Sequence, residues 1–168
     1  LSEPRPEYAG VELHKAFAGL TGVVTLGQMQ EHNSAMGMTG TGAMALAATP
    51  RTRFATLAAS VAILDKTALA AMFSIGRTRA YTNGAASLID GASASRTVAW
   101  SLGIAGRDVL HAGDSLGLSV SMPVKTVSGA MRVTTADIQD PDTGALQFVS
   151  SALSMRPSGT EKVFELAY

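Results

Sequence analysis

Residues 115–124 read SLGLSVSMPV and carry the plainest structural signal in the chain. Large apolar side chains occupy every second position, and Gly or Ser separates them as far as Ser121. Alternation of this kind places every large side chain on one surface of a pleated strand. Pro123 lacks the N–H that a strand ladder needs, so we expect this strand to end there or to lie at a sheet edge.

The same period of two recurs along most of the chain after Phe54. It is clear in residues 68–78 and in residues 97–105, where Trp100 belongs to the large set. Looser alternation follows in residues 130–138, 146–155 and 162–168. Turn signals separate these runs: Asn83-Gly84, Asp90-Gly91, Gly113-Asp114, Ser128-Gly129, residues 141–144 and Ser158-Gly159. About seven strands joined in this way predict an all-β fold, an antiparallel meander that forms a barrel or partial barrel.

The strand face opposite the large side chains carries Gly, Ala, Ser and Thr. A sheet face exposed to water usually carries Lys, Glu and Arg instead. Small residues on that face indicate a barrel interior, close packing of sheets, or a plug lying against the sheet.

The N-terminal segment shows a different spacing. In residues 6–20, Val11, Leu13, Phe17 and Leu20 fit one face of a helix, which Gly19 or Gly22 would end. We therefore expect a Pro-rich linker and a short helix in residues 1–25, followed by an antiparallel β-domain in residues 26–168. We expect a short strand in residues 23–26, which spans the boundary between these two parts, and an irregular segment in residues 27–50.

Composition limits the classes of function. The 168 residues fit one domain, and 13 basic against 13 acidic residues leave no charge signature for nucleic acid or for an anionic membrane surface. Cysteine is absent, which excludes disulfides and thiolate metal sites and suits a chain that crosses an oxidising periplasm. Pro50, Arg51 and Arg53 interrupt the longest apolar stretch, residues 42–64, so no transmembrane helix is predicted.

No residue combination predicts catalysis, a cofactor or a metal. His14, His32 and His111 lack metal-ligand spacing, and no Gly-x-Ser-x-Gly motif occurs. Residues 40–45 match G-x-G-x-x-A, with Asp65 further on, but a dinucleotide site needs a βαβ unit. The remaining candidate carboxylates sit at predicted turns, where Asp bonds the backbone: Asp90, Asp114, Asp137, Asp140 and Asp142. We therefore expect no catalytic, cofactor-binding or metal-binding residues in this chain.

Three segments, FSIGRT (73–78), GDSLGLSVSMPV (113–124) and LSMRPSGTE (153–161), carry a family resemblance. Residues 73–168 resemble the C-terminal β-region of some bacterial subtilisin-like serine proteases, which is similar to autotransporter β-domains. Residues 40–47 faintly resemble the subtilisin nucleophile motif, but Gly42 stands at the nucleophile position and the motif's Pro is missing. The resemblance implies a catalytic site upstream of Leu1 and further strands after Tyr168.

The resemblance implies a non-catalytic domain that anchors, exports or helps to mature a protease or passenger domain of the same parent chain. Its location would be the bacterial outer membrane, the periplasm or the cell exterior. The alternatives are a soluble β-sandwich or barrel that docks protein or carbohydrate, in which Trp100 is buried between layers, and a small hydrolase on a β-scaffold. Only 5% of the residues are aromatic, which is few for a membrane barrel with aromatic girdles and keeps the soluble alternative open.

The last strand, residues 162–168, keeps its alternation to the final residue. Such a strand either closes a barrel, with residues 54–64 as its partner, or leaves an exposed edge that recruits a second copy. We expect the exposed edge and a homodimer formed through it.

Overall fold

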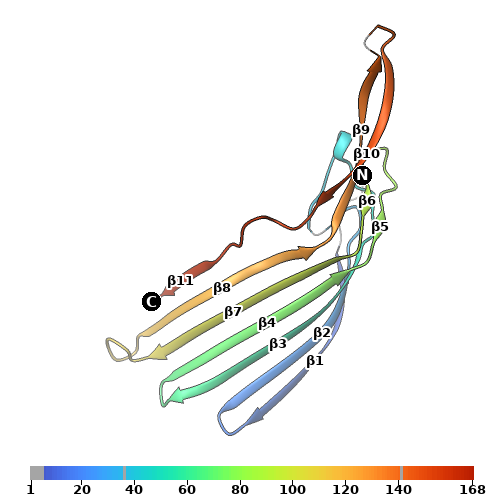
Figure 1. Cartoon of the computed structure of the whole chain (residues 1–168). Helices are drawn as coiled ribbons and strands as arrows, with labels where there is room; N and C mark the ends of the chain where they lie inside the picture. Colours follow the sequence, from blue (N-terminus) through green and yellow to red (C-terminus); the bar gives the residue numbers. More distant parts are fainter. Residues whose placement is uncertain (1–5, 36, 141) are drawn as a thin grey trace.

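The computed structural model describes residues 6–35, 37–140 and 142–168, and it is all-β (Figure 1). A seven-stranded antiparallel sheet has the order β1-β2-β3-β4-β7-β8-β11, and a four-stranded sheet has the order β10-β9-β6-β5. The strands of the large sheet are β1 (Glu7–Phe17), β2 (Leu20–Gln30), β3 (Arg51–Leu64), β4 (Thr67–Thr78), β7 (Ser95–Arg107), β8 (Ser115–Ser128) and β11 (Val163–Ala167). The small sheet contains β5 (Tyr81–Thr82), β6 (Ile89–Ala92), β9 (Ala130–Asp140) and β10 (Ala145–Ser154). The predicted all-β antiparallel fold is confirmed.

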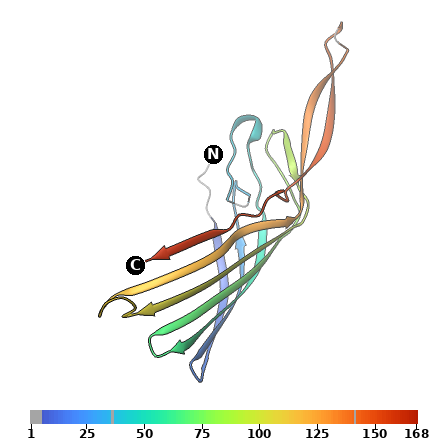
Figure 2. The same cartoon turned by 60° about the vertical axis from the view of Figure 1, so that its left-hand side comes forward.

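The large sheet is curved but open (Figures 1 and 2). Its edges are β1 and β11, and β11 pairs with β8 from Val163↔Ser121 to Ala167↔Gly117. The proposed closing pair between residues 162–168 and 54–64 is therefore wrong. β3 already has β2 and β4 as its two neighbours, so it has no free edge to offer.

The predicted N-terminal helix is also wrong, because that segment is strand β1. Every residue of β1 pairs with β2, from Glu7↔Gln30 to Phe17↔Leu20. The spacing of Phe17 and Leu20 suggested a helical turn, but the two residues face each other across a two-residue hairpin. Ala18 and Gly19 have φ of 47° and 81°, the positive values that such hairpin turns require.

Two other local predictions were partly wrong. The irregular segment expected from residue 27 begins only after Gln30, where β2 ends. β8 does not end at Pro123 but continues to Ser128, with a bulge in its pairing to β7 between Val98 and Trp100. The edge position of Pro123 was right, since the pairing with β11 stops at Ser121 and leaves that side of Pro123 unpaired.

The connections of the large sheet differ in length at its two ends. At one end β1–β2, β3–β4 and β7–β8 are joined by two residues (18–19), two residues (65–66) and a seven-residue loop (108–114). At the other end the connections are residues 31–50, 79–94 and 129–162, and they contain the whole small sheet. The β9–β10 hairpin projects away from this second end (Figure 1).

Buried side chains gather at the end with the long connections. Among the described residues, the apolar core there consists of Ala35, Leu46 and Ile89, with Tyr81 and Met131 packed against it. Asn83 ties the loops together, since its Nδ2 donates to the carbonyl oxygens of Ala45 (2.8 Å) and Ile89 (2.9 Å). The loops and the β5–β6 part of the small sheet thus pack around a small core, while the large sheet and the β9–β10 hairpin extend beyond it.

Glycines on the large sheet let aromatic rings lie flat against it. The Phe54 ring lies over Gly27 and stacks on Tyr8, with ring centroids 5.7 Å apart. A Cβ atom added at Gly27 would lie 2.4 Å from Cζ of Phe54, far inside van der Waals contact. The ring would have to move, which would disturb its stacking on Tyr8.

Substituting Gly27 with Ala should therefore lower the free energy of unfolding by about 1–3 kcal/mol through overpacking. A urea titration measures this change. Gly22→Ala is the matched control on the same strand, because its Cβ would meet only the Lys15 carbonyl oxygen of β1, 3.9 Å away. Equal losses in the two variants would show that the ring–glycine contact is not what matters.

Candidate functional site

The two faces of the large sheet differ in chemistry. Strand register brings the large apolar side chains of neighbouring strands side by side, as in the row Leu57↔Phe73↔Trp100↔Met122. Further rows flank it on the same face, which we call the apolar face. Its members include Val11, Leu13, Val24, Leu26, Ala55, Leu57, Val61, Leu69, Phe73, Ile75, Val98, Trp100, Leu102, Ile104, Leu118, Val120, Met122, Phe164 and Leu166.

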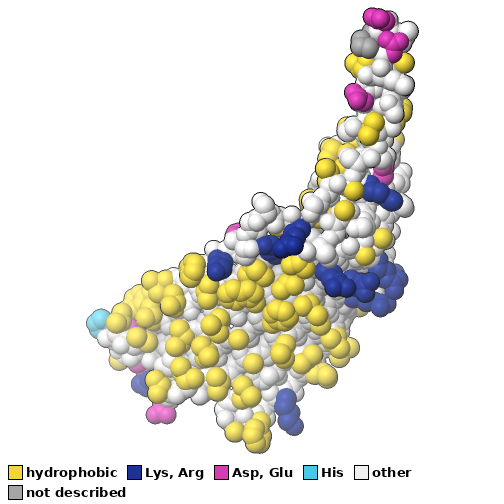
Figure 3. All heavy atoms as spheres, in the orientation of Figure 1, with side chains coloured by type: hydrophobic (Ala, Val, Ile, Leu, Met, Phe, Trp, Pro, Cys, Tyr) yellow, Lys and Arg dark blue, Asp and Glu magenta, His cyan; other side chains and the backbone are white. Residues whose placement is uncertain are grey.

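The apolar face is exposed. Leu57 is 56% exposed, Phe73 49% and Leu118 54%. The small sheet lies beyond the strand ends and does not cover them (Figure 2), and the apolar side chains form a broad field in Figure 3. Trp100, which a two-layer soluble fold would bury, is only partly buried. Soluble monomers rarely expose an apolar surface of this extent, so the face needs a partner or an apolar medium.

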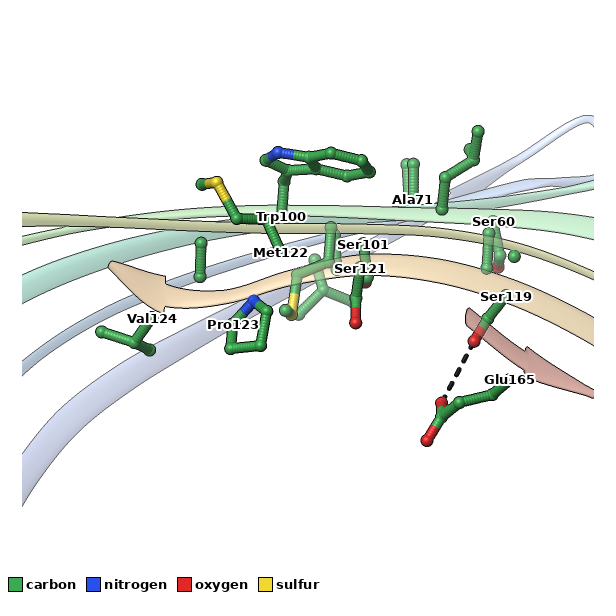
Figure 4. A pocket seen from close by; sticks show the side chains of 18 of the residues that line it. Ser60, Ala71, Trp100, Ser101, Ser119, Ser121, Met122, Pro123, Val124 and Glu165 are labelled. Carbon is green, nitrogen blue, oxygen red and sulfur yellow. Dashed lines mark hydrogen bonds between the residues drawn. The ribbon is translucent and has the colours of Figure 1, made fainter. Parts of the chain in front are cut away.

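The opposite face carries mainly small and polar side chains, as the alternation predicted, together with the stacked rings of Tyr8 and Phe54; we call it the small-residue face. Hydroxyl groups pair across its strands, with Thr52 Oγ1 2.8 Å from Thr78 Oγ1 and Thr56 Oγ1 2.9 Å from Ser74 Oγ. Ser119 Oγ donates to Glu165 Oε2 at 3.1 Å, and in Figure 4 both project from the side of the sheet opposite Trp100. The face is hollowed, and its lining is mainly Ala, Ser and Thr.

No known protein family, curated protein or solved structure matches this chain. Among the described residues, no helix has the length and apolar content needed to cross a membrane.

The structure scatters the residues that were weighed as catalytic or metal-binding. His14 Nε2 lies 2.6 Å from Glu12 Oε1, His32 lies beside Gln30, and His111 belongs to the 108–114 loop. The described part of the chain contains no group of three or more metal-ligating side chains.

The weak dinucleotide pattern is not on a βαβ unit. Residues 42–44 form a single 3₁₀ turn that leads into extended chain, and Asp65 lies in the β3–β4 turn at the other end of the sheet. Of the Asp residues predicted at turns, Asp140 accepts from nearby Thr143 Oγ1 at 2.6 Å. The turn predicted at Asp90 and Asp137 is wrong, since these residues lie in strands β6 and β9, and Asp90 accepts from Thr134 Oγ1 of β9 at 2.6 Å. These contacts are structural.

One group of functional interest was missed in the sequence. Arg53, Arg77 and Arg96 are direct register partners, Arg53↔Arg77↔Arg96, so they form a row across β3, β4 and β7. They lie on the apolar face at the end with the long connections, next to Ile75 and Val98. The arginines are far apart in the sequence, and only the strand register could have revealed the row.

At the opposite end, two carboxylates organise the 108–114 loop. Asp114 accepts the backbone N–H groups of Val109, Leu110 and His111 at 2.7–2.9 Å. Asp108 accepts from Lys66 Nζ at 2.7 Å and from the Gly113 N–H at 2.5 Å. The Lys66 ammonium and then the Gly113 N–H hold the pKa of Asp108 below its ordinary value.

Lys66→Gln should raise the pKa of Asp108 toward its ordinary value, because it removes the first of these two donors. Because the pKa of Asp108 is lower in the folded chain, its carboxylate stabilises the loop at pH values above the unfolded pKa of about 3.9. This stabilisation is lost as the pH falls through the folded pKa. NMR titration of the Asp108 carboxyl carbon measures the midpoint, with Lys15→Gln as a distant control. An unchanged midpoint in Lys66→Gln would contradict the assignment.

Proposed function

We propose that this chain is a non-catalytic, autotransporter-type β-domain whose large sheet forms part of the wall of an outer-membrane barrel. The main observation that supports this proposal is that the sheet has an exposed apolar face and a hollowed small-residue face. In a membrane barrel the outward side chains contact lipid and the inward ones line a polar interior. The same sequence in a soluble sandwich would need a second layer over the apolar face, and the small sheet does not supply one.

Strand length and connection length agree with this proposal. The six long strands of the large sheet have 11 to 14 residues, and a strand needs about 9–11 to cross a bilayer at a tilt. Outer-membrane barrels have short turns on the periplasmic side and long loops outside the cell. By that comparison, residues 18–19, 65–66 and 108–114 face the periplasm, and the small sheet lies on the cell exterior.

The role of such a domain is mechanical. It would anchor, export or support the maturation of a protease domain of the same parent chain, as the resemblance to β-regions of subtilisin-like proteases suggests. The dispersed histidines and the Gly42 at the weak nucleophile pattern favour a domain without chemistry of its own.

The single tryptophan provides a direct test of the lipid-facing surface. Trp100 lies on the apolar face and Ser101 on the small-residue face. In vesicles whose acyl chains carry bromine, the fluorescence of Trp100 should be strongly quenched. A Trp100→Phe/Ser101→Trp variant moves the indole to the other face, where we expect weak quenching. Equal quenching of the two proteins, or none in a wild-type chain that retains its strands by circular dichroism, would refute the proposal.

The open edges of the sheet require a partner in lipid, because every backbone group there must be paired. We propose that a second copy pairs through β11, where Phe164 and Leu166 are each 73% exposed. This contact would pair one of the two open edges, and β1 at the other edge would need a further partner strand. Charged side chains on an edge strand oppose such pairing.

Leu166→Lys should weaken this dimer roughly tenfold or more, about 1.4 kcal/mol, as measured by light scattering in detergent across a concentration series. Leu13→Lys is the control, since Leu13 is 64% exposed on the same face but belongs to the opposite edge strand, β1. A wild-type chain that is monomeric at high concentration would count against the homodimer.

A further inference from the structure

We propose that Arg53, Arg77 and Arg96 form a binding site for the phosphate headgroups of anionic lipid. This inference rests on the proposed membrane-facing role of the apolar face, and it assigns a specific lipid chemistry to one border of that face. The three residues are called the arginine row below.

The geometry of the row calls for an anion. Directly opposed residues of antiparallel strands have Cβ atoms about 4.5–5.5 Å apart, and like charges in such positions destabilise the sheet. All three arginines are exposed. In the described part of the chain, none of their guanidinium groups has an ion-pair or hydrogen-bond partner. Three uncompensated charges side by side are best explained by a polyvalent anion that binds between them.

More positive charge lies at the same end. Arg51 precedes Arg53 by two residues on the same face of β3, and its Nη2 donates to Gln30 Oε1 at 2.8 Å. The Arg79 N–H donates to the Arg51 carbonyl oxygen at 3.1 Å, which holds Arg79 beside β3. Basic side chains gather at this end of the apolar field in Figure 3.

The surroundings of the row favour a lipid over a free anion. Arg53, Arg77 and Arg96 line a shallow groove together with Ile75, Val98 and Val127. Ile75 and Val98 belong to the apolar face, so a bound headgroup would place its acyl chains along that face. Guanidinium groups bind phosphate oxygens in a bidentate manner, and their planar fork suits this border between polar and apolar surroundings.

The test compares vesicles of phosphatidylcholine alone with vesicles that also contain phosphatidic acid. Each basic residue near an anionic bilayer contributes about fivefold to binding. Arg77→Gln/Arg96→Gln should therefore lose roughly 25-fold in affinity for the anionic vesicles and little for the neutral ones. The charge-matched control is Lys66→Gln/Arg107→Gln at the short-turn end, where Asp108 already neutralises Lys66. It should lose about fivefold or less, because, of these two residues, only Arg107 carries a charge without an ion-pair partner in the described part of the chain.

The outcomes separate this inference from the proposed function. Equal losses of affinity in the two double variants, or no preference of the wild-type chain for phosphatidic acid, would overturn the lipid site. Quenching of Trp100 in neutral vesicles would in that case still support the membrane-facing role of the apolar face. Binding to neither kind of vesicle would overturn both. If inorganic phosphate competes for the arginine row as strongly as the headgroups in vesicles do, the row is an anion site without lipid selectivity. That result also contradicts the proposal. Circular dichroism confirms that each variant retains its strands.

Discussion

The substitution Ala71→Arg should reduce partitioning of the protein into lipid vesicles by roughly 30- to 900-fold. The estimate corresponds to the cost of about 2–4 kcal/mol for Arg at the lipid-facing midplane of a β-barrel. Ala71 lies on the apolar face between Ala59 and Leu102, in a row midway along the strands. In the Ala71→Arg variant the guanidinium group would contact acyl chains and would have no counter-charge there.

The neighbouring residue supplies a matched control. Ala70 is also exposed, but it lies on the small-residue face opposite Ser60 and Gly103. Ala70→Arg adds the same charge to the same strand and should change partitioning by less than about threefold, because lumen positions tolerate charge. Vesicle co-flotation with increasing lipid measures both variants. Equal losses would mean that the two faces do not differ in their contact with lipid.

Gly91→Ala should lower the free energy of unfolding by about 3 kcal/mol or more, mainly by disrupting the small sheet. Gly91 has φ +150°, and an added Cβ would lie 2.2 Å from the Tyr81 carbonyl oxygen and 2.9 Å from the Thr82 Cα. The colliding atoms are backbone, so β5 and β6 would have to separate. Their separation would open the core around Ile89 and Tyr81.

Gly113→Ala distinguishes collision from backbone strain. Gly113 has φ +91°, but an added Cβ would meet nothing within 4 Å, so only the left-handed conformation is penalised, by about 1–2 kcal/mol. Urea titration gives both free energies, and limited proteolysis of residues 79–94 localises the change to the small sheet. A Gly91→Ala variant no less stable than Gly113→Ala would contradict the close approach of β5 to Gly91.

Strand content was predictable because alternation acts locally. In residues 115–122 each side chain's face follows from its position alone, and only the bulge opposite residues 98–100 places Val124 on the other face. The N-terminal segment was misassigned because Phe17 and Leu20, three residues apart, satisfy both a helical turn and a tight hairpin. Pairing with β2 resolves that ambiguity, and pairing is not local.

The chain's own pattern of residues therefore sets the period, the turns and the contrast between large and small faces. Register and layer arrangement came only from the folded chain. The equal numbers of basic and acidic residues gave no sign of an anionic membrane partner, yet pairing of β3, β4 and β7 aligns Arg53, Arg77 and Arg96 into one row. Alternation likewise left open whether Trp100 faces a second layer. Contacts between distant residues depend on which strands become neighbours. The free energy of the whole sheet determines this strand order, and no single segment does.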